Sequence, residues 1–243
     1  PVRAGLEHKR KLFMTNSIPL DVEESEEIYF NIYMAKVMEK CIGLKLQGDL
    51  THLYVAETTA EDKITVDKFL PKSDKLTIAI APFSSTRMKD LPPNTYKAFI
   101  EKFHAKENCR FVIIGGKSDV QKDFYLPAED IDLRGKTSMT ETAEILRRSD
   151  YFIGSCSAPL HMAAATKTPS LAFYGPTSPQ KWAPLNYCNY IQHKQDCSPC
   201  DRVGHGIFCN EENICMKSIT AEEILTAFEK LRKQYPIQPI QSV

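Results

Sequence analysis

Short, unbroken apolar runs that alternate with helical patterns constrain the fold of this chain more than any other feature. Residues 111–114 read Phe-Val-Ile-Ile and are followed by two glycines, and residues 151–153 read Tyr-Phe-Ile and are followed by Gly154. Such runs are typical of parallel strands, because helices cover both faces of a parallel sheet. From residue 76 onward they alternate with helical segments, which predicts βαβ units. The expected fold class is α/β, with a Rossmann-like parallel sheet.

The expected elements can be placed along the chain from residue 76. We expect strands at 76–81, 111–114, 132–133, 151–154 and 170–175, and helices at 95–103, 138–148, 159–166 and about 220–234. Capping boxes begin two of these helices, Ser138 with Glu141 and Thr220 with Glu223. Ligands of such sheets bind beyond the carboxyl ends of the strands, so the loops after the strands are the candidate site.

The first 75 residues have a different pattern. A helix is expected at 21–41, entered at Asp21 and Glu24 and ended before Gly43. One or two short strands are expected within 44–56. Residues 57–75 are polar and charged, and we place a linker or domain boundary there.

Charge and hydropathy exclude two classes of partner or location. The 31 basic and 31 acidic residues give a net charge of zero and form no long basic stripe, so nucleic acid is not an expected partner. No apolar run is long enough to span a bilayer. The eight cysteines are not needed as a disulfide framework in a chain of this size, which favours a reducing, cytoplasmic compartment.

The first two loops after predicted strands contain residues suited to phosphate and ribose. The hydroxyls of Ser84 and Ser85 and the ammonium of Lys89 can hold phosphate oxygens, although an ordinary polar turn has the same composition. In the next loop, glycines 115 and 116 allow a close backbone approach. Asp119 would accept hydrogen bonds from ribose hydroxyls or, alternatively, cap a helical turn.

The third and fourth loops follow the two later strands. At Ser157 and Ala158 a strand gives way to a helix, whose free amides and dipole favour a phosphate. His161, one turn later, either donates to the same anion or has a structural role. Cys156 has no evident base and is interpreted as a buried thiol. In the fourth loop, a rigid Gly/Pro turn, Thr177 either faces the ligand or supports the turn.

Four cysteines cluster near the end of the chain. They are Cys197, Cys200, Cys209 and Cys215. They have the ligand type of a zinc site, but their spacing is irregular and the second pair lacks the separation of a zinc knuckle. This pattern favours a loop with reduced thiols or one disulfide, and we expect no metal.

The four loops, in this order, resemble the family 9 glycosyltransferases, the lipopolysaccharide heptosyltransferases. The resemblance rests on residues 132–138 (Asp-Leu-Arg-Gly-Lys-Thr-Ser), residues 157–165 (Ser-Ala-Pro-Leu-His-Met-Ala-Ala-Ala) and residues 169–177 (Pro-Ser-Leu-Ala-Phe-Tyr-Gly-Pro-Thr). It is strong over residues 76–235 and weak before them. It implies a GT-B architecture, in which two Rossmann-like domains enclose the active site.

In that architecture the chain divides into two parts. Residues 1–75 would be the remnant of an N-terminal acceptor-side domain with a linker, and residues 76–243 the C-terminal nucleotide-sugar-binding domain. The residues that match the family's donor site are Ser84, Ser85, Lys89, Asp119, Ser157, Ala158 and His161. Cys156 stands where the family has an aspartate proposed to contact the transferred sugar. A thiol cannot replace a carboxylate as acceptor, which points to a different sugar.

The resemblance implies a reaction and its partners. A heptose-like sugar would move from an ADP-sugar to a lipopolysaccharide core acceptor, with inversion and without a metal or cofactor. The partners would be the nucleotide-sugar donor and a lipid-linked saccharide, met by a peripheral protein at the inner face of the cytoplasmic membrane. The family's catalytic carboxylate lies in strands expected before residue 1, so no catalytic residue is assigned. The alternatives are a transferase for a different nucleotide sugar, a non-catalytic nucleotide-sugar-binding protein and a zinc-dependent interaction module.

Overall fold

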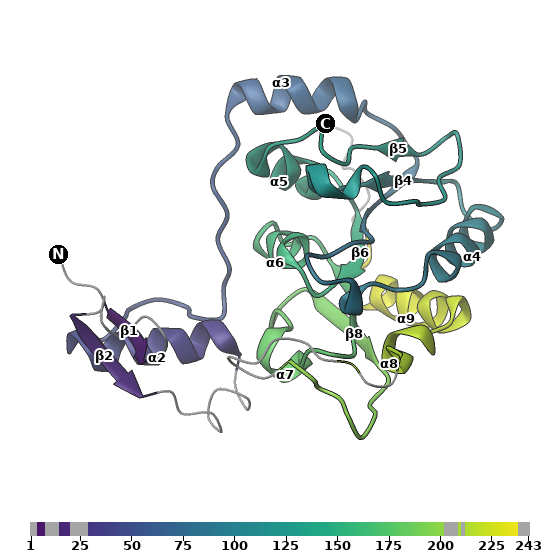
Figure 1. Cartoon of the computed structure of the whole chain (residues 1–243). Coiled ribbons are helices and arrows are strands. Elements are labelled where there is room, and N and C mark those ends of the chain that lie inside the picture. The colour runs from purple at the N-terminus through teal and green to yellow at the C-terminus, as the bar shows by residue number, and fades with distance from the viewer. Residues whose placement is uncertain (1–3, 8–14, 20–28, 202–208, 210–211, 238–243) are drawn as a thin grey trace.

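A six-stranded parallel sheet forms the centre of the molecule in the computed structural model, which describes residues 4–7, 15–19, 29–201, 209 and 212–237 (Figure 1). The strands are β3 (Leu76–Ala81), β4 (Cys109–Ile113), β5 (Ile131–Asp132), β6 (Tyr151–Ser155), β7 (Ser170–Tyr174) and β8 (Cys188–Gln192). All neighbouring pairs are parallel. The expected α/β class and the five expected strands are confirmed, and β8 is an addition.

The strand order is β5-β4-β3-β6-β7-β8, which reverses direction in the middle of the sheet. From β3 the chain builds outward to β4 and β5, and it then returns to place β6 on the other side of β3. The connections that leave β3 and β6 therefore diverge. This is the position at which open parallel sheets form a ligand crevice.

Helices cover both faces of the sheet, as the unbroken apolar strands require. The helices that follow the N-terminal segment are α3 (Ala60–Phe69), α4 (Pro93–His104), α5 (Met139–Arg147), α6 (Ala158–Ala165), α7 (Pro179–Trp182), α8 (Ile214–Lys217) and α9 (Ala221–Gln234). Alternate residues of the strands pack with α4 and α9 on one face, around Phe99, Phe103 and Phe228. The intervening residues pack with α3, α5 and α6 on the other.

The N-terminal segment is a small unit beside this sheet (Figure 1). Strands β1 (Ala4–Glu7) and β2 (Asn16–Pro19) pair in parallel, and α2 (Phe30–Ile42) packs against them. Gly43 ends α2 with φ of 69°, as expected. The expected entry at Asp21 and Glu24 lies outside the described residues. Residues 44–56, where strands were expected, form none and instead run in an extended path toward α3.

Helix α3 lies within residues 57–75, where a linker was expected. Thr59 and Asp62 form a capping box at its start, since the Asp62 amide donates to Thr59 Oγ1 at 3.1 Å and the Thr59 amide donates to Asp62 Oδ2 at 2.9 Å. Val66 is 0% exposed and packs into the sheet's second core. Arg148, just after α5, pairs with Asp67 at 2.5 Å. The segment is thus part of the folded body, and the domain boundary near residue 75 stays a prediction.

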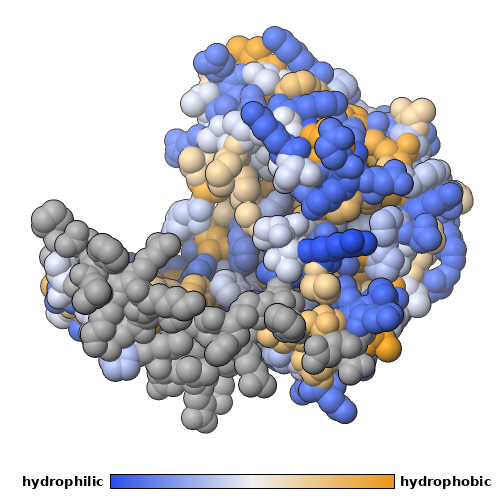
Figure 2. Space-filling view, viewed as in Figure 1, coloured by the Kyte–Doolittle hydropathy of each residue, from blue (hydrophilic) through white to orange (hydrophobic). Residues whose placement is uncertain are grey.

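The surface is mixed in polarity. Hydrophilic residues cover most of the visible face, with smaller hydrophobic groups between them (Figure 2). No helix in the described ranges is long and apolar enough to cross a membrane.

Candidate functional site

A cleft of about 600 Å³ lies beyond the carboxyl ends of the central strands, where the sheet order reverses. Eight of the nine predicted donor residues line it: Ser84, Ser85, Lys89, Asp119, Cys156, Ser157, Ala158 and His161. The structure therefore brings together loops that are up to 77 residues apart in sequence (residues 84 and 161). Their role in binding stays a prediction.

The loop after β3 presents a hydroxyl and a cation to this cleft. The Ser84 hydroxyl is occupied within the turn, where it donates to the Thr86 carbonyl at 2.7 Å, and the Ser84 amide donates to Asp90 at 2.8 Å. Ser85 is exposed, and its hydroxyl makes no hydrogen bond with a described residue. Lys89 ends the short 3₁₀ turn η2 (Arg87–Lys89) and makes no ion pair within the described ranges. Ser84 thus shapes the turn, while Ser85 and Lys89 are available to a ligand.

The loop after β4 is closed by Asp119. This carboxylate accepts from the Gly116 amide at 2.9 Å and pairs with Lys122 at 2.8 Å. A Cβ on Gly115 would lie 2.9 Å from Asp119 Oδ2, so a larger residue there would displace this hydrogen-bonded carboxylate. This geometry supports the capping interpretation of Asp119. Asp119 also lines the cleft, and its contact with a ribose stays a prediction.

The start of α6 leaves one amide, that of Ala158, without an acceptor among the described residues. Pro159 has no amide proton, and the Leu160 amide donates to the Ser157 carbonyl at 3.1 Å. Ser157 precedes the helix, but its hydroxyl donates to the Ser155 carbonyl at 3.2 Å and accepts from no amide of the first turn. Ser157, Ala158 and Pro159 all line the cleft. A free amide at a helix start, together with the dipole, favours an anion.

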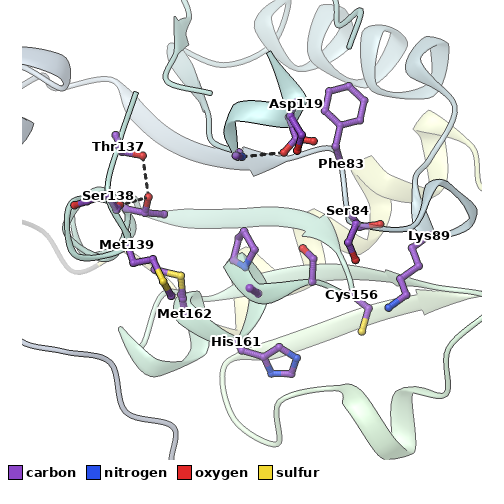
Figure 3. A pocket seen from close by; sticks show the side chains of 18 of the residues that line it. Phe83, Ser84, Lys89, Asp119, Thr137, Ser138, Met139, Cys156, His161 and Met162 are labelled. Carbon is purple, nitrogen blue, oxygen red and sulfur yellow. Dashed lines mark hydrogen bonds between the residues drawn. The ribbon is translucent and has the colours of Figure 1, made fainter. Parts of the chain in front are cut away.

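Two neutral side chains and one cation meet near this helix start (Figure 3). Burial, with a smaller effect from the Lys89 charge, lowers the pKa of His161. Cys156 is 4% exposed, and burial raises the pKa of its thiol although Lys89 acts in the opposite direction. At neutral pH the imidazole is therefore uncharged and the thiol protonated, which leaves Lys89 as the charged member of this group.

Thr177 is the predicted site residue that does not reach the cleft. It is 1% exposed, and its side chain lies beside Cys156, where it lowers the pKa of the thiol. The Gly/Pro turn holds Thr177 behind Cys156 and away from the cleft lining. The predicted contact of Thr177 with the ligand is therefore replaced by a contact that supports Cys156.

Several lining residues were not predicted from the sequence. They are Phe83, Thr137, Ser138, Met139, Thr142, Met162 and Trp182. Met139 is 71% exposed at the first turn of α5. In Figure 3, Met139 and Met162 lie at one end of the view, and Lys89 and Cys156 lie at the other. A single methionine in a capped helix is an ordinary helical residue, so no sequence pattern predicted that Met139 and Met162 line the cleft.

The clustered cysteines lie apart from the cleft lining. All four are free thiols, and the described ranges contain no group of three or more His, Cys, Asp or Glu residues that could hold a metal ion. The segment from Cys197 to Cys200 packs on the turn after β7, where the Cys200 amide donates to the Pro176 carbonyl at 2.9 Å. Burial, then the neighbouring thiols, raise the pKa of Cys200 to about 11.

Comparison with known proteins gives one family. The model of "Glycosyltransferase family 9 (heptosyltransferase)" matches residues 1–205. Lipopolysaccharide heptosyltransferase 3 of Escherichia coli (strain K12) is 34% identical over 99 residues, which are 41% of this chain and 28% of that protein. Lipooligosaccharide heptosyltransferase 2 of Haemophilus influenzae is 38% identical over 56 residues, 23% of this chain and 16% of that protein. The matched stretches thus span less than a third of either relative.

Solved structures share the fold. The glycosyl transferase family 9 structure from Veillonella parvula superposes with a TM-score of 0.71 at 19% identity, covering 96% of this chain and 68% of that one. The structure of E. coli ADP-heptose lps heptosyltransferase II superposes with a TM-score of 0.72 at 20% identity and covers 96% of this chain and 70% of that one. The structure of E. coli heptosyltransferase WaaC with ADP superposes with a TM-score of 0.58 at 15% identity and covers 90% of this chain and 61% of that one.

Proposed function

This chain belongs to glycosyltransferase family 9, the heptosyltransferase family, and we propose that its cleft binds an ADP-sugar whose heptose-like sugar is transferred to a lipopolysaccharide core acceptor. The observation that carries the proposal is the cleft itself. A cation without a described ion pair, an exposed hydroxyl and an open helix start face one space at the reversal of the sheet. This combination suits a diphosphate.

The reaction places its charge where these groups lie. As the acceptor hydroxyl attacks the anomeric carbon, the bond to the nucleoside diphosphate breaks and negative charge develops on the leaving oxygens. Lys89, the Ala158 amide at the start of α6 and the Ser85 hydroxyl line the cleft and would stabilise that charge. Attack from the face opposite the diphosphate inverts the anomeric centre, as the family resemblance implies. We assign no metal to the reaction and no general base to the described residues.

The nucleoside is expected at the apolar end of the cleft. Met139 and Met162 offer flexible, polarisable surface to a planar base. The structure of E. coli heptosyltransferase WaaC, which has the same fold, contains ADP. Adenine is therefore the base that we propose.

The names of the relatives support a proposal for the acceptor of the sugar and for the cellular location of this protein. Two are heptosyltransferases of lipopolysaccharide or lipooligosaccharide. We propose a lipid-linked saccharide as acceptor and a peripheral position at the inner face of the cytoplasmic membrane.

Cys156 favours a second candidate, a transferase for a different nucleotide sugar. It lies on the cleft beside Lys89 as a protonated thiol, where the resemblance leads us to expect a carboxylate. A thiol is a weak acceptor and would bind fewer sugar hydroxyls than a carboxylate does. Transfer measured across a panel of ADP-sugars would separate the two candidates.

A thermal-shift panel with ADP, GDP, UDP and CMP tests the donor site. A nucleotide at about a hundred times its dissociation constant stabilises the fold by roughly 2.7 kcal/mol. We expect a selective response to ADP. A response to none of the four, or an equal response to all, would contradict an ADP-sugar site in this chain.

A further inference from the structure

The residues just before and at the start of α2 reach across to the donor cleft. Tyr29 is 3% exposed and its hydroxyl lies 3.4 Å from His161 Nδ1, although the two residues are 132 positions apart. The next residue, Phe30, stacks on Trp182 with ring centroids 4.8 Å apart. The Phe30 contact anchors the backbone, so the Tyr29 hydroxyl is held against the imidazole.

A third residue favours one direction of the hydrogen bond between Tyr29 and His161. Asn31 Nδ2 donates to the Tyr29 oxygen at 3.1 Å. Because that oxygen is already an acceptor, its own proton is free to point at His161 Nδ1. The pKa of Tyr29 is raised to about 12, chiefly by burial, so the hydroxyl keeps this proton at neutral pH.

A neutral imidazole that accepts at Nδ1 must carry its proton on Nε2. His161 is uncharged because burial lowers its pKa. Nε2 makes no hydrogen bond with any residue in the described part of the chain, and His161 lines the cleft. The N–H of Nε2 is therefore available to an oxyanion there.

We propose that Tyr29 and Asn31 are positioning residues of the donor site, which hold His161 in the tautomer that donates from Nε2 to a diphosphate oxygen. The inference rests on the proposed function for the identity of the anion. It extends that function by making an N-terminal residue part of donor binding, and it requires no movement or charge change.

The test combines a tautomer measurement with a double-mutant cycle on the full 243-residue chain. Imidazole ¹⁵N chemical shifts of His161, assigned with His161→Ala, distinguish protonated from unprotonated Nδ1 without any ligand. We expect the wild type to show Nε2–H alone. Asn31→Asp offers Tyr29 a carboxylate acceptor in the same place, which reverses the chain of hydrogen bonds, so we expect Nδ1–H in this variant.

Affinity for ADP provides the second readout. Tyr29→Phe removes one hydroxyl and keeps the ring, and we expect about fivefold weaker binding, the value of one hydrogen bond. In the His161→Ala background the same change should have no effect, whereas a purely structural role of Tyr29 would weaken binding equally in both backgrounds. Tyr54→Phe, at a tyrosine that is 81% exposed, is the matched control.

The outcomes separate this inference from the proposed function. If the wild type binds no ADP, the donor proposal fails while the ¹⁵N spectra still decide the role of Tyr29. A spectrum that is unchanged in Tyr29→Phe and Asn31→Asp, or an equal loss of affinity in both backgrounds, would overturn the inference.

Discussion

At the scale of single residues, Lys89 carries the electrostatics of the cleft. Its charge acts on both His161 and Cys156, and within the described ranges it has no carboxylate partner. An ammonium without such a partner contributes its charge to a ligand without first breaking an internal ion pair. This arrangement distinguishes Lys89 from Lys122, which is paired with Asp119.

Replacement of Lys89 should weaken the binding of the donor nucleotide. We expect Lys89→Ala to lower the affinity for ADP by about tenfold to a hundredfold, since hydrogen bonds to charged groups are worth about 1.5–3 kcal/mol. Isothermal titration calorimetry measures the change. Lys97→Ala is the control, because Lys97 lies on α4 beside Glu101 and Tyr125, outside the cleft lining. Equal losses in the two variants would contradict the role of Lys89.

Cys156 should react slowly with alkylating reagents. The thiolate is the reactive species, and a raised pKa lowers its fraction at any pH below that pKa. We expect iodoacetamide at pH 8 to modify the exposed Cys197 before Cys156, with the rate at Cys156 rising as the pH is increased. Peptide mass spectrometry follows both sites, and the denatured chain is the reference. Rapid modification of Cys156 in the folded chain would show that its thiol is not protected.

At the scale of elements, burial decided which strands and helices were predictable. The residues of β4, β6 and β7 are all buried, so each of these strands contains a short apolar run that the sequence shows clearly. Strand β8 lies at the edge of the sheet, and four of its five residues are half-buried. Its sequence, Cys-Asn-Tyr-Ile-Gln, is polar enough to read as a loop. Helix α3 buries only Val66, so its apolar stripe was too short to detect.

The capping box of α3 gives a prediction for that element. Thr59→Ala removes the hydroxyl that accepts from Asp62, and we expect a loss of about 1 kcal/mol in the free energy of unfolding. Chemical denaturation measures it. Thr226→Ala is the matched control, because its hydroxyl bonds only the Glu222 carbonyl within α9, where alanine is a better helix former. A comparable loss in both variants would argue against the cap.

At the scale of the whole molecule, aromatic side chains join helices from distant parts of the sequence. Phe228 of α9 contacts Phe99 and Phe103 of α4 and Tyr151 of β6, with ring centroids 5.2–6.2 Å apart. This aromatic cluster packs α9 against the sheet. We infer that unfolding of α9 exposes the core of this face.

Truncation within this cluster should therefore be costly. Phe228→Ala removes a fully buried ring, and we expect a loss of about 3–5 kcal/mol in the free energy of unfolding. Calorimetry or denaturant titration measures the loss. Leu185→Ala, at a leucine that is 50% exposed, should change the free energy by no more than about 0.5 kcal/mol. A small effect of Phe228→Ala would mean that α9 contributes little to the core.

The sequence also predicted the assembly of the site better than its details. Loops after parallel strands must meet at one edge, so Ser85, Lys89 and His161 were expected together and are together. The contacts of Met139, Trp182 and Tyr29 depend on how helices pack across the cleft, and no local pattern encodes that. Thr177 was misplaced because a turn's position does not reveal which way its side chain points.

The reversal of strand order between β3 and β6 has a consequence for how this chain can diversify. Loops on the two sides of the reversal are built on separate strands, so each can vary in length and composition without disturbing the register of the other. At the polar end of the cleft, Lys89 follows β3 and Cys156 follows β6, so these two residues lie on loops from opposite sides of the reversal. We expect that replacement of Cys156 alone, which leaves Met139 and Met162 in place, alters the sugar that is accepted and leaves the preference for the base unchanged.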